Sequence, residues 1–218
     1  MGGRVRWGFS TVLFLGLSFV GADGAAGQTL EWGARLGFNV SAVLYADGGA
    51  LNGVVPKPGL HLGAATAWEI SQHATVEAAV VASQDGFRGE GAHPGDFRMD
   101  YVDVPVVGKL RLPTRVSPHL LAGFAVGYMV RCRLTGVAIV GDTTCDDRLV
   151  GTRWRSFDFG ALGGIGVSLP TRRGRWEFDL FGSLGIRDLK VDLLPPGAAR
   201  RVAARLSVTL FPTREDRS

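Results

Sequence analysis

The chain has few cysteines, few charged residues, no long apolar run after its N-terminus and no regular glycine repeat. Only two of its 218 residues are cysteines, and charged residues make up 20% of it, below the usual quarter. Past residue 28, no run approaches the roughly 18 apolar residues that a membrane-spanning helix needs. The 32 glycines follow no Gly-X-Y repeat. Membrane-spanning helices after residue 28 and a collagen-like fibre are therefore excluded.

Apolar residues are abundant in this chain, whereas charged residues are few. Hydrophobic residues make up 46% of the chain and the mean hydropathy is +0.16, which excludes intrinsic disorder. The length predicts one domain, or at most two small ones. The net charge is +4, but the basic residues form no stripe along the sequence. We therefore expect no nucleic-acid partner and assign the positive charge to loops and rims.

The N-terminus has the layout of a secretory signal peptide. Two arginines precede an apolar run over residues 7–22, and small residues follow it. We predict a signal over residues 1–27, with cleavage after Gly27 or after Ala22, and a mature domain over residues 28–218. The alternative is a signal anchor that stays on the chain, although the apolar core is short for a span.

A period of two dominates the mature chain, and this is the side-chain period of a β-strand. In one segment, for example, Val102, Val104 and Val106 lie on one face of the strand, and Asp103 and Lys109 lie on the other. Such segments number about eight, each of roughly 10 to 14 residues, which is the length that a tilted membrane-spanning strand requires. The predicted strands cover residues 30–44, 59–70, 73–84, 99–112, 118–132, 153–169, 175–188 and 200–211.

The links between these strands alternate strictly in length. Short links, near residues 71–73, 113–118 and 170–174, alternate with four long ones. In an up-and-down barrel this order places every long loop at one end, and both chain termini with the short turns at the other. Such asymmetry is typical of a transmembrane barrel, whereas a lipocalin-like soluble barrel does not need it.

The polar face of the strands fits the inside of a narrow barrel better than a soluble surface. It combines small residues with charges of both signs, which can pair in a lumen. We predict a lumen charge network of Glu31, Arg35, Glu69, Glu77, Asp103, Lys109, Arg111, Asp158, Glu177, Asp179, Arg187 and Arg205. On the apolar face, three tryptophans near the short turns predict an interfacial aromatic belt, with core packing as the alternative: Trp32, Trp68 and Trp176.

These patterns together predict an all-β protein, an eight-stranded antiparallel up-and-down transmembrane β-barrel. In hydrocarbon every backbone N–H and C=O must be paired within the protein, so a spanning sheet must close on itself. Eight strands leave an interior mostly filled by side chains. We therefore expect no wide diffusion pore.

Two segments also resemble a known family. The run from Tyr101 to Leu110, with its acidic residue, Val-Pro pair and lysine, is similar to a signature of the PorT-like outer-membrane β-barrel family. The Asp-Phe-Gly and glycine-rich stretch from Phe157 to Gly166 resembles that family's sixth strand. The resemblance implies a barrel in the outer membrane of a Gram-negative bacterium. It also implies a family whose members mostly lack an assigned activity and whose namesake is associated with protein secretion and gliding.

Cys132 ends the predicted strand over residues 118–132, and Cys145 lies in the third long link, which follows that strand. Cys132 and Cys145 favour a disulfide, because an exported chain meets an oxidising compartment. They lack the paired spacing of a zinc site. A calcium site among the neighbouring aspartates is the remaining metal alternative. We expect no cofactor.

Catalysis has weak support in the sequence. The four histidines are His61, His73, His93 and His119, and no spacing forces any of them next to a nucleophile. We name no catalytic residue.

We expect a non-enzymatic envelope protein, with long extracellular loops in a structural or binding role. Its partners would be outer-membrane lipid and an envelope protein held by the loops, and the barrel would be a monomer. The alternatives are a small-solute or ion channel and, less favoured, a lipid-modifying enzyme of the outer membrane.

Overall fold

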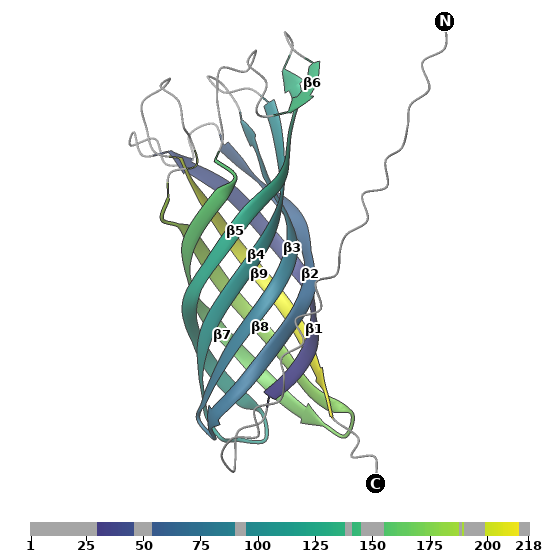
Figure 1. Cartoon of the computed structure of the whole chain (residues 1–218), viewed down its shortest axis with the longest axis vertical. Coiled ribbons are helices and arrows are strands. Elements are labelled where there is room, and N and C mark those ends of the chain that lie inside the picture. Colours follow the sequence, from purple (N-terminus) through teal and green to yellow (C-terminus); the bar gives the residue numbers. More distant parts are fainter. Residues whose placement is uncertain are drawn as a thin grey trace, which may run out of the picture.

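The strands of this chain close into a barrel. The structure is a computed structural model, and it describes residues 30–45, 54–89, 95–137, 141–144, 155–187, 189 and 199–213. Eight long strands within these ranges form the wall (Figure 1): β1 (Leu30–Tyr45), β2 (Val54–Ser71), β3 (Ala74–Gly89), β4 (Gly95–Arg111), β5 (Ser117–Val137), β7 (Phe157–Thr171), β8 (Gly174–Gly185) and β9 (Ala199–Pro212). A short strand, β6 (Gly141–Thr144), pairs with β5 alone.

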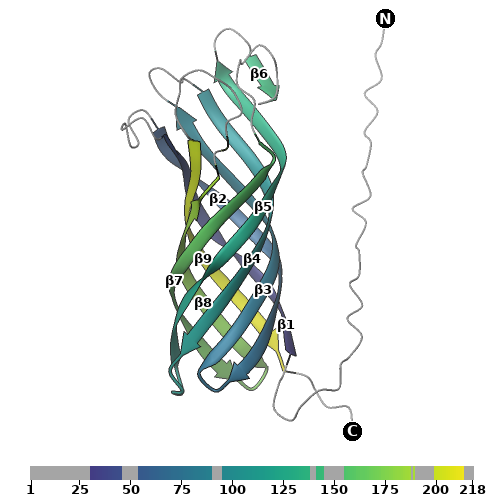
Figure 2. The same ribbon diagram turned by 60° about the vertical axis from the view of Figure 1, so that its left-hand side comes forward.

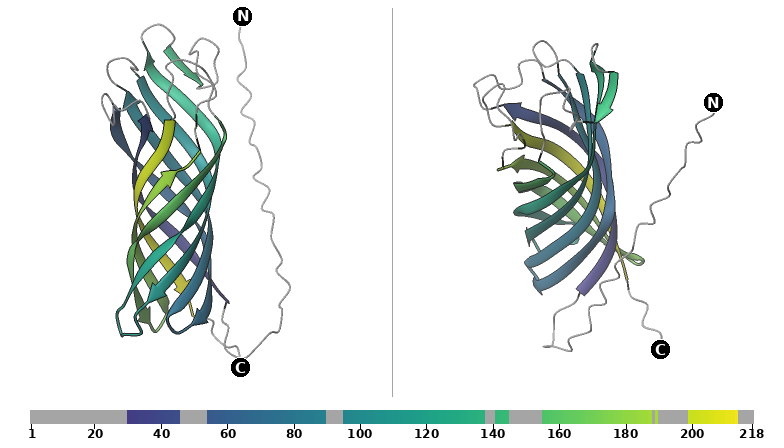
Figure 3. Two further views of the ribbon diagram at one scale, coloured as in Figure 1. Left: turned by 90° about the vertical axis from the view of Figure 1, so that its left-hand side faces the viewer. Right: turned by 45° about the horizontal axis from the view of Figure 1, so that its top comes forward.

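Every long strand pairs antiparallel with two neighbours. Consecutive strands of the wall pair in chain order, and β1 pairs with β9 to close the cylinder. Seen from other sides, the strands tilt around a tall cylinder (Figures 2 and 3). The wall has no free edge, so its backbone groups are paired within the sheet. The predicted eight-stranded antiparallel barrel is therefore confirmed. In the described ranges, no helix is long and apolar enough to cross a membrane.

The apolar side chains of the wall point outward and the charged ones point inward. Leu36 and Phe38 are 61% and 62% exposed, whereas Glu77 and Lys109 are each 1% exposed. A water-soluble barrel would show the opposite arrangement, because burial of apolar area drives its folding. The outer surface is thus suited to lipid, as the sequence predicts.

The two ends of the barrel differ. Short turns join β2 to β3, β4 to β5 and β7 to β8 at one end, which we call the turn end. Trp32, Trp68 and Trp176 lie near this end on the outer face and are all substantially exposed. The β7–β8 turn needs Gly174, whose φ of +143° is rare for residues with a side chain. The opposite end, which carries β6 in Figure 1, is called the loop end.

Several predicted strands are too short at the loop end. β2 begins at Val54 and β3 ends at Gly89, each five residues beyond the predicted boundary, and β5 continues to Val137. β8, in contrast, ends at Gly185, before the predicted residue 188. The barrel wall continues past the lipid-facing band, where an apolar outer face is no longer required and the alternation fades. The predicted signal over residues 1–27 lies outside the described residues and stays a prediction.

Candidate functional site: a filled lumen

Strand alternation sends every second side chain of the wall into the lumen. Among the residues that the structure describes, eleven of the twelve members of the predicted charge network form ion pairs there, and Arg187 is the exception. Because β8 ends at Gly185, Arg187 leaves the alternation and is exposed. Its guanidinium lies 5.7 Å from the ring centroid of Phe157, on the outer face. The assignment of Arg187 to the lumen was wrong.

Lys109 is the centre of a group of ion pairs in the half of the lumen toward the turn end. Its Nζ lies 2.9 Å from Glu77 Oε2, 2.5 Å from Glu177 Oε2 and 2.8 Å from Asp179 Oδ2. The ammonium donates to three carboxylates from β3 and β8, which uses all three of its N–H donors. The Lys109 side chain is 0% exposed. A fully buried charge of this kind is tolerated only when it is paired and hydrogen-bonded.

Three arginines extend this group across the lumen. Arg35 Nη2 lies 2.5 Å from Glu77 Oε1, and its Nε donates to Thr209 Oγ1 at 2.8 Å. Arg111 and Arg175 add contacts to carboxylates closer to the turns. We call the whole set the turn-side cluster: Glu31, Arg35, Glu69, Glu77, Lys109, Arg111, His119, Arg175, Glu177 and Asp179. Its four Lys and Arg side chains face five carboxylates.

A serine, a histidine and an aspartate meet inside this cluster. His119 Nε2 lies 2.7 Å from Asp179 Oδ1, and His119 Nδ1 lies 3.4 Å from Ser168 Oγ. Ser168 also donates to Glu177 Oε1 at 3.2 Å. These are the residue types of a hydrolase triad, but catalysis needs a substrate to reach the hydroxyl. Ser168 is 1% exposed within a packed lumen. The arrangement therefore satisfies buried polar groups.

The same place has donors for a metal ion. Ligand atoms of His119, Glu177 and Asp179 lie within 4.8 Å of one another. However, the ammonium of Lys109 contacts both carboxylates and already supplies the compensating positive charge. A divalent cation at this place would have to displace Lys109.

Arg201 organises a second group of ion pairs, nearer the loop end. Its Nη2 lies 2.7 Å from Asp103 Oδ2 and its Nε lies 2.6 Å from Asp85 Oδ2. Arg205 contacts the same two aspartates, at 3.0 Å and 3.4 Å. With Asp158, whose carboxylate is 3.7 Å from Arg201, these residues form the loop-side cluster. It has two arginines and three aspartates, so, like the turn-side cluster, it has one carboxylate more than its cations.

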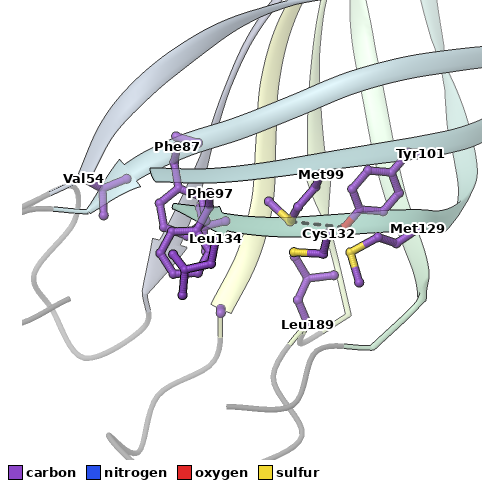
Figure 4. Packing of buried hydrophobic residues seen from close by; sticks show 12 residues of the cluster. Val54, Phe87, Phe97, Met99, Tyr101, Met129, Cys132, Leu134 and Leu189 are labelled. Carbon is purple, nitrogen blue, oxygen red and sulfur yellow. Dashed lines mark hydrogen bonds between the residues drawn. The ribbon is translucent and has the colours of Figure 1, made fainter. Parts of the chain in front are cut away.

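Apolar side chains fill the lumen beyond the loop-side cluster. Phe87 and Phe97 stack with their ring centroids 4.4 Å apart, and Arg201 lies 4.0 Å from the ring centroid of Tyr101. Leu189, which belongs to the link between β8 and β9, is fully buried among them (Figure 4). We call this set the apolar cluster: Ala42, Val43, Val54, Phe87, Phe97, Met99, Tyr101, Met129, Cys132, Leu134, Leu189 and Ala199.

One small cavity lies beside these layers. A cavity beside the loop-side cluster, lined in part by Asp103, Asp158 and Arg201, has a volume of about 20 Å³. That volume holds about one water molecule. In the described part of the lumen, side chains and ion pairs thus occupy successive levels from the turn end to the loop end.

Sequence reasoning missed Asp85, Arg175 and Arg201 as network residues. Each one continues the alternation of its own strand into the lumen, two residues from an inward-facing neighbour. Asp85 lies just beyond the predicted strand over residues 73–84. Arg175 and Arg201 lie at the start of the predicted strands over residues 175–188 and 200–211, but neither was assigned to the charge network. The meeting of His119 with Ser168 and Asp179 depends on strand register, which the sequence alone does not supply.

A closed sheet with an apolar exterior and a paired ionic interior defines a β-barrel membrane protein. Residues 22–191 match the family described as outer membrane protein beta-barrel domain, and this chain belongs to that family. The protein is accordingly located in the outer membrane of a Gram-negative bacterium.

The chain is also similar in fold to solved structures. Neisserial surface protein A (NspA) matches with a TM-score of 0.50 and 13% identity, over 85% of this chain and 99% of its own. OprG from Pseudomonas aeruginosa has a TM-score of 0.47 and 12% identity, over 86% and 94% of the two chains. Ail of Yersinia pestis has a TM-score of 0.44 and 17% identity, over 83% and 97%. No curated protein matches the sequence.

Proposed function

We propose that this protein is a non-enzymatic barrel of the outer membrane. Its closed lumen anchors long extracellular loops, which make structural or binding contacts in the cell envelope. The observation that carries the proposal is the filled lumen, with two ionic clusters and an apolar cluster stacked along its axis. A barrel built to conduct would leave a continuous polar path, as larger barrels do.

The ionic interior gives the wall rigidity without a pore. Each charge in the turn-side cluster has at least one opposite partner, so opening a path there would break several buried pairs together. A rigid wall is a suitable support for loops that bind, because scaffolds hold functional loops in position. The finer assignment to PorT-like barrels, with a partner among envelope proteins, is part of this proposal.

Planar-bilayer recording tests the proposal against the channel alternative. The purified mature protein should give no conductance steps above those of protein-free bilayers. A Lys109→Met variant, which removes the shared cation, is a useful comparison. If an ion path can open through the turn-side cluster, this variant should be the first to show conductance steps. Regular steps from the unaltered protein would contradict the closed lumen and favour a small-solute or ion channel.

A disulfide between Cys132 and Cys145 belongs to the same proposal. Strand β6 pairs with β5 so that Thr144 lies opposite Arg133, and these residues are the chain neighbours of the two cysteines. Cys145 itself lies outside the described residues. Alkylation of the unfolded, unreduced protein followed by mass spectrometry should add no label, and reduction should allow two. Two labels before reduction would contradict the bond.

A further inference from the structure

Arginines gather on the outer wall of the barrel near the loop end. Arg98 of β4 and Arg133 of β5 are exposed and lie directly opposite each other in the strand pairing. Arg131, also exposed, lies on β5 two residues away. Like charges placed opposite each other across a strand pair destabilise a sheet. The fold alone therefore gives no reason for this arrangement.

A local irregularity creates this group. The register of β4 and β5 shifts between the pairs Asp100–Arg131 and Tyr101–Met129, so Val130 is an extra residue on β5. Such a bulge changes which side chains face outward beyond it. Here it directs Arg131 and Arg133 outward, while Cys132 between them is buried.

Within the described chain, the three arginines form no ion pair. Asp100, half-buried and opposite Arg131, is the nearest carboxylate by register, and it makes no ion pair with any of them. The next carboxylate along β4, Asp96, already contacts Lys57 and Arg88. This differs from the lumen, where every Lys and Arg of the two clusters has a carboxylate partner.

The arginines lie at a definite height on the barrel. The outward apolar residues of β4 and the link after it extend from Val102 to Leu112, which corresponds to about 25 Å of membrane thickness at a usual strand tilt. Arg98 and Arg133 lie about 10 Å beyond Val102 by the same measure. They are thus just outside the hydrocarbon, at the level of lipid headgroups.

We propose that Arg98, Arg131 and Arg133 form a binding site for the phosphate groups of an outer-leaflet glycolipid. Long links face the cell exterior in outer-membrane barrels, so the loop end meets the outer leaflet. The guanidinium group binds phosphate through paired N–H donors, and two opposed guanidinium groups can hold one phosphate between them. An anion between Arg98 and Arg133 would also relieve their mutual repulsion.

Native mass spectrometry of the mature protein in detergent tests this site. The probes are diphosphorylated lipid A and the same lipid after enzymatic removal of its phosphates. We expect the unaltered protein to bind the phosphorylated lipid at least about tenfold more tightly, as loss of charge-assisted hydrogen bonds implies. The double variant R98Q/R133Q should lose this preference.

Two further variants keep the result specific. The variant R172Q/R173Q removes the same charge from the exposed β7–β8 turn at the opposite end and should keep the preference. The variant R98K/R133K keeps the charge but loses the paired donors, so it should bind with intermediate affinity. A faster gel band without heating than after boiling verifies that each variant is folded.

Several results would overturn the site. The first is equal binding of phosphorylated lipid A by the unaltered protein and by folded R98Q/R133Q. The second is equal affinity of the unaltered protein for the two lipids. The third is binding of inorganic phosphate or heparin at least as tightly as lipid A, because the ligand would then be a soluble anion or a sulfated polysaccharide. None of these results depends on whether the lumen conducts, so they leave the proposed function unaffected.

Discussion

The two halves of the lumen are filled in different ways. Toward the turn end, Lys109 and its neighbours form a nearly balanced set of buried ion pairs. Toward the loop end, Arg201 and the aspartates around it give way to packed rings and methionines such as Phe87 and Met99. The comparison shows that alternation decides which residues face inward. The kind of side chain that fills the interior, ionic or apolar, changes along the barrel axis.

This difference has an energetic consequence. A buried ion pair stabilises little in net terms, but the loss of one partner leaves a charge without compensation. An apolar cluster loses only the transfer free energy of the removed atoms and the cost of the cavity. We therefore expect the turn-side half to be the more sensitive to single substitutions.

The largest effect should come from Lys109→Met. It leaves Glu77, Glu177 and Asp179 without their shared ammonium and should lower the free energy of unfolding by about 4 kcal/mol. Urea unfolding of the barrel in lipid vesicles measures this change. The control Lys57→Met removes a partly exposed partner of Asp96 and should cost less than about 1 kcal/mol. Equal losses in the two variants would show that burial of the ion pairs is unimportant.

A smaller loss is expected from Phe87→Ala in the apolar cluster. Phe87 is fully buried and stacked on Phe97, so its truncation should cost about 3 kcal/mol, at the lower end for a buried aromatic residue. The same unfolding assay applies, with Phe38→Ala on the lipid-facing side as the comparison. If Phe87→Ala destabilises more than Lys109→Met, the order of the two halves is reversed.

Arg205→Gln should have a moderate effect, about 1.5 kcal/mol. Arg201 contacts Asp85 and Asp103 as well, so both carboxylates keep a cationic partner after the change. Arg201→Gln should therefore be clearly more damaging than Arg205→Gln in urea unfolding. Similar losses from the two variants would show that the aspartates do not depend mainly on Arg201.

The smallest effect is expected from Ser168→Ala. It removes a 3.2 Å hydrogen bond to Glu177, which has other donors, and should cost less than about 1 kcal/mol. If the lumen serves a structural role, lipid A from cells that produce the variant should match lipid A from cells with the unaltered protein. A changed lipid A profile, with the barrel still folded, would support the lipid-modifying alternative.

Most of the fold could be predicted from the sequence because period two is a local property. Alternation such as that around Asp103 and Lys109 identified both the strands and the inward face, and the link lengths identified the two ends. The strand limits at the loop end could not be predicted, because beyond the lipid the outer face does not need to be apolar. Without those limits, Asp85 is assigned to a loop.

The pairing inside the site depends on information that is not local. Lys109 meets Glu177 and Asp179 across the lumen, from strands that are not neighbours in the wall. The bulge at Val130 likewise depends on how β4 and β5 align. Strand register and shear determine these meetings, and a single sequence does not state either one.

The central claim is that the barrel faces lipid on its outside, and tryptophan fluorescence in brominated lipid bilayers tests it most directly. Variants that keep one of Trp32, Trp68 or Trp176 would be reconstituted with bromine at different depths along the acyl chains. The account predicts quenching at all three positions, strongest with bromine close to the headgroups. Emission as intense as in unbrominated lipid would contradict it, because these side chains would then lie inside a barrel that faces water.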